Sequence, residues 1–309
     1  MTINKPNKTG IINVYKEKDF TSHDVVAILR KLTGCKAGHT GTLDPAAEGV
    51  LPICLGRATK LADYIMAADK TYVAEFVPGI TTDTYDTSGE IVTRNAVDLT
   101  TADVAQAAAG FVGKLKQLPP MYSAIKINGK KLYELARKGE SVERKPRDVV
   151  VHSIRVLERE EAAVIGCVSD RSGVFFLEVH CSKGTYIRSL CADMGEVLGC
   201  GAAMGALTRT QSGTFFLENA VKLDKLREAA QTGGADDYIQ PVDTVLPHPR
   251  VQVLESGVAM ALNGNPLPIT LLQPLPEGER FWVCSPDGTI IGLYTLEEKK
   301  GRLRSAVQL

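Results

Sequence analysis

The apolar residues in the first part of the chain recur with helical spacing in some segments and with strand spacing in others. Between residues 25 and 32 they repeat at intervals of three and four, a polar stretch comes before them, and Gly34 follows as a stop. Residues 72–77 instead alternate between the two sides of a strand. A third segment, residues 104–111, again has helical spacing. The pattern therefore predicts helices on either side of a strand.

The second part of the chain continues this irregular alternation. Residues 149–156 and 174–181 have the period of two that is typical of strands, and residues 187–194 place apolar side chains on one face of a helix. Strands that are interleaved irregularly with helices favour the α+β class over a regular parallel α/β fold. We expect an α+β protein with a mixed or antiparallel sheet.

Two prolines within three residues mark a change in organisation near residue 247. The stretch 245–249 is typical of a linker, and residues 251–309 after it contain a short helical pattern and two strand-like runs. The chain has 309 residues, more than a typical single domain. We therefore predict a main domain at residues 1–246 and a small β-rich domain at residues 247–309.

The composition of the chain bears on where the protein works and on whether it has disulfides or a bound metal. Hydrophobic residues make up 44% of the chain, but no apolar run approaches the roughly 20 residues that span a bilayer, and the N-terminus lacks a signal-peptide pattern. The seven cysteines are scattered without a Cys-x-x-Cys pair, and the five histidines show no metal-ligand spacing. We expect a soluble cytoplasmic protein with reduced, mostly buried thiols and no bound metal.

Charge is balanced over the whole chain but not along it. The 36 basic residues match the 36 acidic ones, yet residues 114–147 hold ten basic and three acidic residues, a local excess of seven positive charges. We call residues 114–147 the basic segment. A charge run is often only a solvated helix face, but an imbalance of this size is better explained by contact with a phosphate backbone.

One loop combines features that suit a catalytic carboxylate. We call residues 38–51 the Asp44 loop; it is rich in glycine and threonine and places Asp44 directly before Pro45. Glycines permit unusual backbone angles, and the proline restricts both its own φ and the conformation of the residue before it. Taken alone, Asp44-Pro45 is more often a simple turn than a site.

The Asp44 loop resembles a known motif. Its first eight residues, Gly-His-Thr-Gly-Thr-Leu-Asp-Pro at 38–45, are identical to the catalytic motif of the TruB family of tRNA pseudouridine synthases. The similarity extends over most of residues 10–215. It implies an enzyme without a cofactor that isomerises uridine to pseudouridine in the T-arm of tRNA, at position 55. It also implies the pseudouridine synthase catalytic domain, and a C-terminal part similar to a PUA domain.

Residue roles follow from the same resemblance. Asp44 is then the catalytic carboxylate, and Arg188, in Gly-Thr-Tyr-Ile-Arg, is the arginine that pairs with it. Tyr72 corresponds to the active-site tyrosine that stacks on the target base and takes part in proton transfer. Tyr186 and Leu207 match positions that line the pocket. Taken singly, each of these residues is more often a packed core or surface side chain.

The resemblance also implies residues that bind RNA. His39 corresponds to a family residue that inserts where the flipped base has left its stack. Lys126, Lys130 and Lys131 in the basic segment are expected to contact the tRNA backbone. The region after residue 250 has five basic and six acidic residues, so its charge gives no reason to expect RNA contact there.

The chain departs from the family pattern at one place. Glu17 and Asp19 stand where proline and glycine are usual. This difference puts in doubt whether the usual turn forms there and how strongly RNA binds beside it.

Two rival functions remain open: a tRNA-binding or tRNA-folding protein without catalysis, and an unrelated hydrolase with an aspartate nucleophile. The second is weakened by the lack of a second acid motif or a Gly-x-Ser-x-Gly elbow. The predicted partner is tRNA, with no membrane or protein partner, and a monomer is expected.

Overall fold

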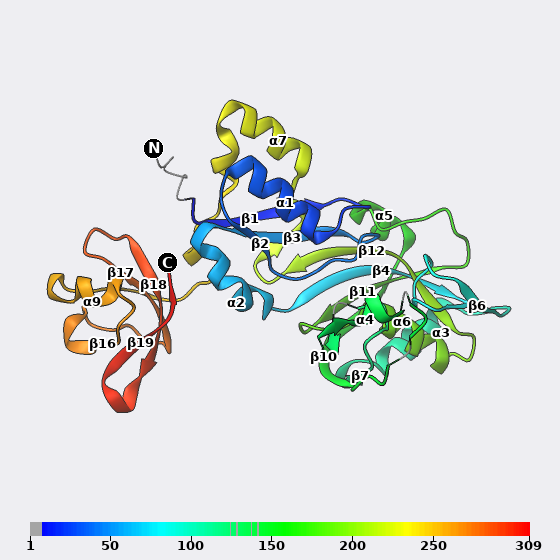
Figure 1. Ribbon diagram of the computed structural model, residues 1–309. Helices are drawn as coiled ribbons and strands as arrows, with labels where there is room; N and C mark the ends of the chain where they lie inside the picture. Colours follow the sequence, from blue (N-terminus) through cyan, green and yellow to red (C-terminus); the bar gives the residue numbers. More distant parts are fainter. Residues whose placement is uncertain (1–7, 124, 128, 137, 141) are drawn as a thin grey trace.

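A large mixed sheet forms the body of the protein in the computed structural model, which describes residues 8–309 except 124, 128, 137 and 141. The main path of this ten-stranded sheet runs β14-β1-β3-β12-β4-β11-β10-β7, with β2 beside β3 and β13 beside β12 (Figure 1). β1 pairs parallel with β14 and β3 with β12, while the other neighbours are antiparallel. The predicted α+β class with a mixed sheet is confirmed. The strands are β1 Gly10–Lys16, β2 Ala37–His39, β3 Glu48–Leu55, β4 Lys70–Pro78, β7 Gly113–Gln117, β10 Arg147–Leu157, β11 Phe175–Cys181, β12 Ala202–Ser212, β13 Phe215–Phe216 and β14 Val221–Lys222.

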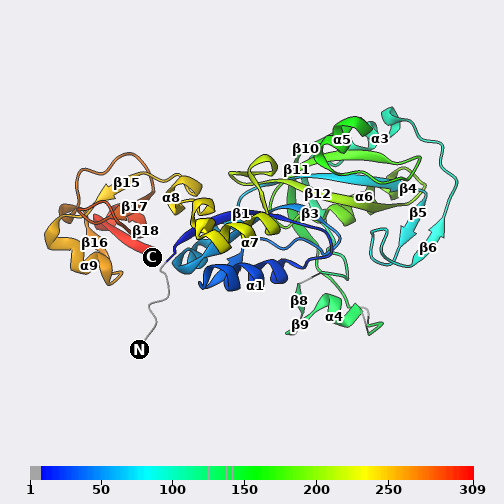
Figure 2. The ribbon, with the colours of Figure 1, turned by 90° about the horizontal axis from the view of Figure 1, so that it is seen from above.

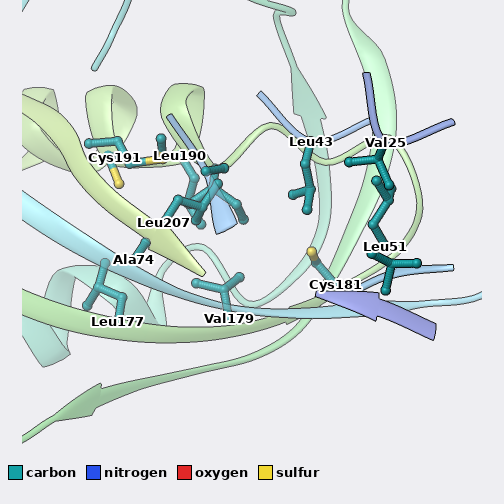
Figure 3. Packing of buried hydrophobic residues seen from close by; sticks show 14 of the residues in the cluster. Val25, Leu43, Leu51, Ala74, Leu177, Val179, Cys181, Leu190, Cys191 and Leu207 are labelled. Atoms are coloured by element: carbon teal, nitrogen blue, oxygen red, sulfur yellow. The ribbon is translucent and has the colours of Figure 1, made fainter. Parts of the chain in front are cut away.

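Four helices share the main hydrophobic core with this sheet. They are α1 (Ser22–Thr33), α3 (Thr101–Ala109), α6 (Ile187–Val197) and α7 (Leu223–Thr232). Figure 3 shows how closely their side chains meet: Leu190 of α6 lies near Leu207 of β12, while Leu43 and Leu51 come from the Asp44 loop. The loop and α6 are therefore fixed against one core. The remaining short helices of the main body are η1 Gly56–Leu61, α2 Ala62–Met66, α5 Arg159–Ile165, η2 Leu217–Asn219, η3 Gly234–Tyr238 and α8 Val242–Val245.

Helix α1 follows the sequence pattern, with one shift at its start. Thr21 is the N-cap, and its side chain and that of Asp24 form a reciprocal capping box, so the cap lies one residue before Ser22. Gly34 ends the helix with φ of 69°, a left-handed conformation that suits glycine. Because Ser22 is not needed as the cap, its hydroxyl is left to bond the Asp44 loop.

The unusual turn between β1 and α1 forms despite the missing glycine. Asp19 takes φ of 70°, in the left-handed region that aspartate tolerates better than most side chains. Its backbone N–H donates to the carbonyl of Pro45 (2.9 Å), so the turn still contacts the Asp44 loop. The replacement of proline and glycine by Glu17 and Asp19 therefore leaves a closed turn.

The basic segment extends away from the sheet. Between β7 and β10 it forms the short strands β8 (Lys126–Ile127) and β9 (Lys130–Lys131) and the helix α4 (Leu132–Ala136). Figure 2 shows this hairpin and helix projecting from the body of the molecule. Leu132 and Leu135 are buried. A second excursion, after β4, contains β5 (Ile80–Thr82) and β6 (Ile91–Arg94).

The C-terminal part is a separate five-stranded sheet, as the sequence predicted for a small β-rich module. It has the order β15-β17-β18-β19-β16 and lies at one end of the molecule (Figure 1). Trp282, Leu293 and Val307 pack in one cluster with side chains of the larger sheet, and the Trp282 indole N–H donates to the carbonyl of Leu246 (2.8 Å). The two sheets are thus joined by an apolar contact, while the boundary at 246/247 remains a prediction. The elements are β15 Arg250–Gln252, η4 Glu255–Gly257, α9 Val258–Leu262, β16 Leu267–Pro268, η5 Ile269–Leu271, β17 Arg280–Cys284, β18 Ile290–Glu297, η6 Glu298–Lys300 and β19 Arg302–Gln308.

All seven cysteines are buried and outside disulfide bonds, as expected from their scattered positions. Burial raises the pKa of Cys54, Cys167 and Cys191 to about 12, so these side chains act as small apolar groups. Within the described part of the chain, every helix is too short or too polar to cross a bilayer.

Candidate active site

The Asp44 loop connects β2 to β3 and is closed by its own backbone. Thr40 donates to the carbonyl of Pro52 through both its N–H and its hydroxyl, each at 3.1 Å. The N–H of Ala47 donates to the carbonyl of Asp44 (3.0 Å), which makes a tight turn around Pro45. These bonds define the direction in which the Asp44 side chain leaves the loop.

Side chains from three other segments hold the loop from outside. The Ser22 hydroxyl donates to the carbonyl of Leu43 (3.2 Å) and accepts from its N–H (2.9 Å). Lys16 donates through Nζ to the carbonyl of Pro45 (3.2 Å). The guanidinium of Arg209, on β12, donates to the carbonyl of Gly41 (3.2 Å). The residues on either side of Asp44 are therefore bonded to β1, α1 and β12.

Arg188 lies directly against Asp44, as the resemblance implies. Its Nη2 is 2.8 Å from Oδ2 of Asp44 and also donates to the carbonyl of Tyr122 (2.9 Å), while Nη1 donates to the carbonyl of Thr84 (3.3 Å). The side chain of Arg188 is 6% exposed and that of Asp44 is 42% exposed. A buried guanidinium thus orients a carboxylate that remains open to solvent on one side.

Asp86 is a site residue that the sequence reasoning missed. Its Oδ2 lies 3.8 Å from Nη1 of Arg188, so the guanidinium lies between two carboxylates. The other oxygen of Asp86 accepts from the Thr84 hydroxyl (2.9 Å) and the Ser88 N–H (3.0 Å). In the sequence, Asp86 lies in a stretch of polar residues that predicts only a loop. Nothing in that stretch indicates that the loop reaches α6.

Tyr72 lies on β4 opposite Arg209 in the pairing of β4 with β12. Burial raises the pKa of the Tyr72 phenol, and the charge of Asp44 raises it further, while the positive charge of Arg209 and a hydrogen bond to it oppose the shift. The phenol therefore keeps its proton near neutral pH. Because Asp44 and Arg209 both act on it, Tyr72 belongs to the same group of side chains.

Tyr186 and Leu207 also lie in this region. The side-chain amide of Gln117 holds the Tyr186 backbone at both polar atoms, accepting from its N–H (2.7 Å) and donating to its carbonyl (2.9 Å). Burial raises the pKa of Tyr186, and the charge of Asp44 adds to the increase. Leu207 is buried in β12 opposite Ala74. The structure brings together Asp44, Tyr72, Tyr186 and Arg188, while Leu207 belongs to the main hydrophobic core. The individual roles of these residues remain predictions.

His39 lies at the start of the Asp44 loop and is half-buried. Its ring meets that of His23 edge to face with the centroids 5.2 Å apart, and its Nδ1 accepts from the N–H of Gly41 (3.4 Å). Burial lowers the pKa of His39, and nearby His23 and Arg209 lower it further. The ring is therefore uncharged near neutral pH, which suits stacking on a base better than contact with a phosphate.

The lysines predicted to contact RNA are only partly described. Lys126 lies on β8, and Lys130 and Lys131 lie on β9, but their side chains are outside the described part of the structure. Their RNA-binding role remains a prediction that depends on the charge of the basic segment.

Buried positive charge surrounds the Asp44 loop, and the sequence reasoning did not anticipate it. Arg209 is almost fully buried and donates to the carbonyls of Val50 (2.7 Å) and Gly41. Burial lowers the pKa of Lys16 from 10.5 to about 8, although Glu48 and Asp44 act in the opposite direction. Together with Arg188, these groups place positive charge around the loop that carries Asp44.

The fold occurs in known proteins. The structure is similar to a chain in "Structure of H/ACA RNP bound to a substrate RNA containing 2'-deoxyuridine", with a TM-score of 0.69, 25% identity, and coverage of 98% of this chain and 85% of that chain. A chain in "Crystal Structure of a Cbf5-Nop10-Gar1 Complex" gives a TM-score of 0.70, 26% identity, and coverage of 98% and 84%. Residues 29–187 match the description "TruB family pseudouridylate synthase (N terminal domain)". The fold is that of a pseudouridine synthase.

The particular family follows from sequence relatives. Residues 188–247 match the "tRNA pseudouridylate synthase B C-terminal domain". The chain is 45% identical to tRNA pseudouridine synthase B of Alkaliphilus oremlandii over 83% of this chain and 82% of the relative. It is 48% identical to the protein of the same name from Lachnoclostridium phytofermentans over 94% of this chain and 96% of the relative. The chain belongs to the TruB family.

Proposed function

We propose that this protein isomerises uridine to pseudouridine in tRNA, at position 55 of the T-arm, with Asp44 as the essential carboxylate. The observation that carries the proposal is the pair between Asp44 and Arg188, in which a buried guanidinium orients a carboxylate that stays open on one side. The relatives named tRNA pseudouridine synthase B support tRNA as the substrate.

The reaction needs few chemical groups. The bond from ribose C1′ to N1 breaks, the uracil rotates, and C1′ joins to C5, while C5 loses a proton and N1 gains one. Atoms balance, so the isomerisation requires no cofactor. What it needs is a carboxylate beside C1′ and a cavity that retains the detached base.

Asp44 supplies the carboxylate in this mechanism. It acts at C1′ either by covalent attack or by stabilising positive charge there. Arg188 fixes the direction of the carboxylate with a 2.8 Å contact. A negative charge that is positioned before the substrate arrives does not have to be reoriented during the reaction.

The tyrosines and His39 act on the base and on the gap it leaves. Tyr72 stacks on the uracil, and its phenol, which is protonated near neutral pH, carries a proton to or from the base. Tyr186 and Leu207 close the cavity around the base. His39, an uncharged and half-buried ring at the start of the Asp44 loop, occupies the space in the RNA from which the base was flipped. The protein works as a cytoplasmic monomer in this proposal.

Release of tritium from tRNA labelled at uracil C5 tests the proposal. We expect Asp44→Asn to lower the single-turnover rate by about 10³-fold or more while tRNA binding is retained. Asp63→Asn, which changes an exposed carboxylate on α2, should leave the rate unchanged. Wild-type turnover by Asp44→Asn would contradict the mechanism.

The position in tRNA needs its own assay. A transcript with cytidine at position 55 should release no tritium, and an isolated T-arm hairpin should release it at a measurable rate. Tight binding of tRNA without any release would instead favour the rival function of a tRNA-binding protein without catalysis. Activity on free nucleotides, with none on tRNA, would favour a hydrolase.

A further inference from the structure

Three side chains that the active site does not use converge on the outer surface of the large sheet. Asp69 directly precedes β4, His152 lies in β10, and His180 lies in β11. One ligand atom from each lies within 4.8 Å of the other two. Nε2 of His152 is 3.1 Å from Oδ2 of Asp69, and the two imidazole centroids are 4.7 Å apart.

An irregularity in the sheet places His152 in this group. The pairing of β10 with β11 shifts register between Val151 and Ser153, so His152 is the extra residue of a bulge. Ser153 is paired with His180 after the shift. Bulges redirect side chains while the strands on either side continue. The bulge explains how His152 reaches both Asp69 and His180.

Asp69 is held in place by its own backbone and by the next residue. Its carbonyl accepts from the N–H of Gly213 (2.9 Å). The following residue, Lys70, turns inward and donates through Nζ to the carbonyls of Met66 (2.6 Å) and Ala68 (2.5 Å). The amine of Lys70 is therefore engaged with the turn, and the carboxylate of Asp69 remains directed to the two histidines.

We propose that Asp69, His152 and His180 form a binding site for a divalent transition-metal ion of the zinc type. Two imidazole nitrogens and one carboxylate oxygen form a donor set that zinc prefers, with a fourth position left for water. Tetrahedral ligands at about 2.0–2.1 Å from zinc lie roughly 3.3 Å from one another. The 3.1 Å contact between Asp69 and His152 is near that spacing, and a small side-chain rotation brings His180 to it.

The ion would join strands that lie side by side in the sheet. Asp69 begins the strand that carries Tyr72, and the histidines lie on the next two strands. A cation there cross-links β4, β10 and β11 at one end of the sheet. The site is outside the group of residues around Asp44, so the expected effect of the ion is on stability. The proposal differs from the sequence prediction of no metal, which considered spacing along the chain only.

Zinc binding by the full-length, tag-free chain tests this site. We expect equilibrium dialysis against micromolar Zn²⁺, followed by elemental analysis, to give one ion per chain and a raised Tm. His152→Ala and His180→Ala should each weaken binding by about 10–100-fold or more, the loss typical of removing even an outer partner of a ligand. His248→Ala, which changes a histidine outside the cluster, should bind zinc like the wild type.

Cobalt substitution identifies the ligands independently. Co²⁺ in the site should give the d–d absorption of a tetrahedral nitrogen and oxygen environment, lost in both variants. Circular dichroism and Tm of the metal-free variants show that they fold. Wild-type protein that retains no ion would overturn the proposal, because Asp69 and His152 would then form only a hydrogen-bonded pair. Unchanged stoichiometry in both variants, or a thiolate-to-cobalt charge-transfer band, would also overturn it.

Discussion

The Asp44 loop and the basic segment are constructed in opposite ways. The loop is held by Lys16, Ser22 and Arg209, which reach it from β1, α1 and β12, and its own Leu43 is buried in the main core. The hairpin and helix of the basic segment project from the body (Figure 2), and their described backbone bonds, such as that from the N–H of Leu132 to the carbonyl of Ile125, are local.

This difference predicts two kinds of response to mutation. In the Asp44 loop, one carboxylate depends on buried groups from distant segments, so removing any of them misplaces it. In the basic segment, the positive charges act on a polyanion through long-range attraction, so removing them weakens binding in proportion to their number.

Arg188→Lys should have the largest effect after Asp44→Asn. A lysine cannot bond the carboxylate of Asp44 and the carbonyls of Thr84 and Tyr122 together. We expect the single-turnover rate of tritium release to fall by about 10²–10³-fold, with little change in tRNA affinity. Arg227→Lys, on the exposed side of α7, is the matched control. A loss of rate smaller than about tenfold would show that Arg188 does not orient Asp44.

Arg209→Met should destabilise the fold. The substitution leaves the carbonyls of Gly41 and Val50 without their donor in a buried place, and each such group costs about 1–3 kcal/mol. We expect the free energy of unfolding in urea to decrease by about 2–4 kcal/mol. Arg227→Met should change it by about 0.5 kcal/mol or less. Equal effects in the two variants would contradict the role given to Arg209.

Neutralising the basic segment should weaken tRNA binding without altering the chemical step. For the combined change of Lys126, Lys130 and Lys131 to glutamine, the slope of log affinity against log salt should fall by about 0.7–0.9 for each phosphate contact removed. The rate at saturating tRNA should stay the same. Glutamine at Lys299 and Lys300, in η6 of the C-terminal part, is the control. A lower rate at saturation would mean that these three lysines also position the active site.

The stability contributed by Lys16 should depend on pH. Burial lowers its pKa in the folded chain from 10.5 to about 8, so between these values the unfolded chain binds more protons than the folded one. Stability linked to this group therefore rises as pH increases from about 8 to 10.5. We expect the difference in unfolding free energy, wild type minus Lys16→Met, to increase across that window. A flat or decreasing difference would contradict the burial of a charged amine.

Asp19 gives the smallest effect. At φ of 70° glycine should be accepted, so Asp19→Gly should change the free energy of unfolding by about 0.5 kcal/mol or less. Asp19→Val places a β-branched side chain in the left-handed region and should lower it by about 1–2 kcal/mol. Thermal or urea unfolding measures both. Equal stability of the two variants would show that the turn adjusts without strain.

The sequence predicted the site best where residues lie close together along the chain. The motif at 38–45 identified Asp44, and the resemblance of a second segment identified Arg188, which the structure places 2.8 Å away. The helical spacing predicted α1 and α6, because one apolar face must be buried against a sheet. Asp86 and Arg209 were missed because they are ordinary polar residues in sequence. Asp86 meets Arg188 of α6, and Arg209 meets the Asp44 loop, only in the folded chain.

The histidines show the same limit. The distance between His152 and His180 along the chain suggests no metal site, whereas a bulge in β10 brings their rings to 4.7 Å. Local signals cannot encode such contacts, since they depend on which strands pair and in what register.

The sequence by itself determined the elements, the charge of the basic segment and the carboxylate that we propose to be reactive, because these depend on periodicity, composition and a contiguous motif. Only the tertiary structure decided which groups surround that carboxylate. Lys16, Arg188 and Arg209 lie far apart in sequence, and they act on one loop because folding removes them from water and leaves nearby carbonyls and carboxylates as their partners.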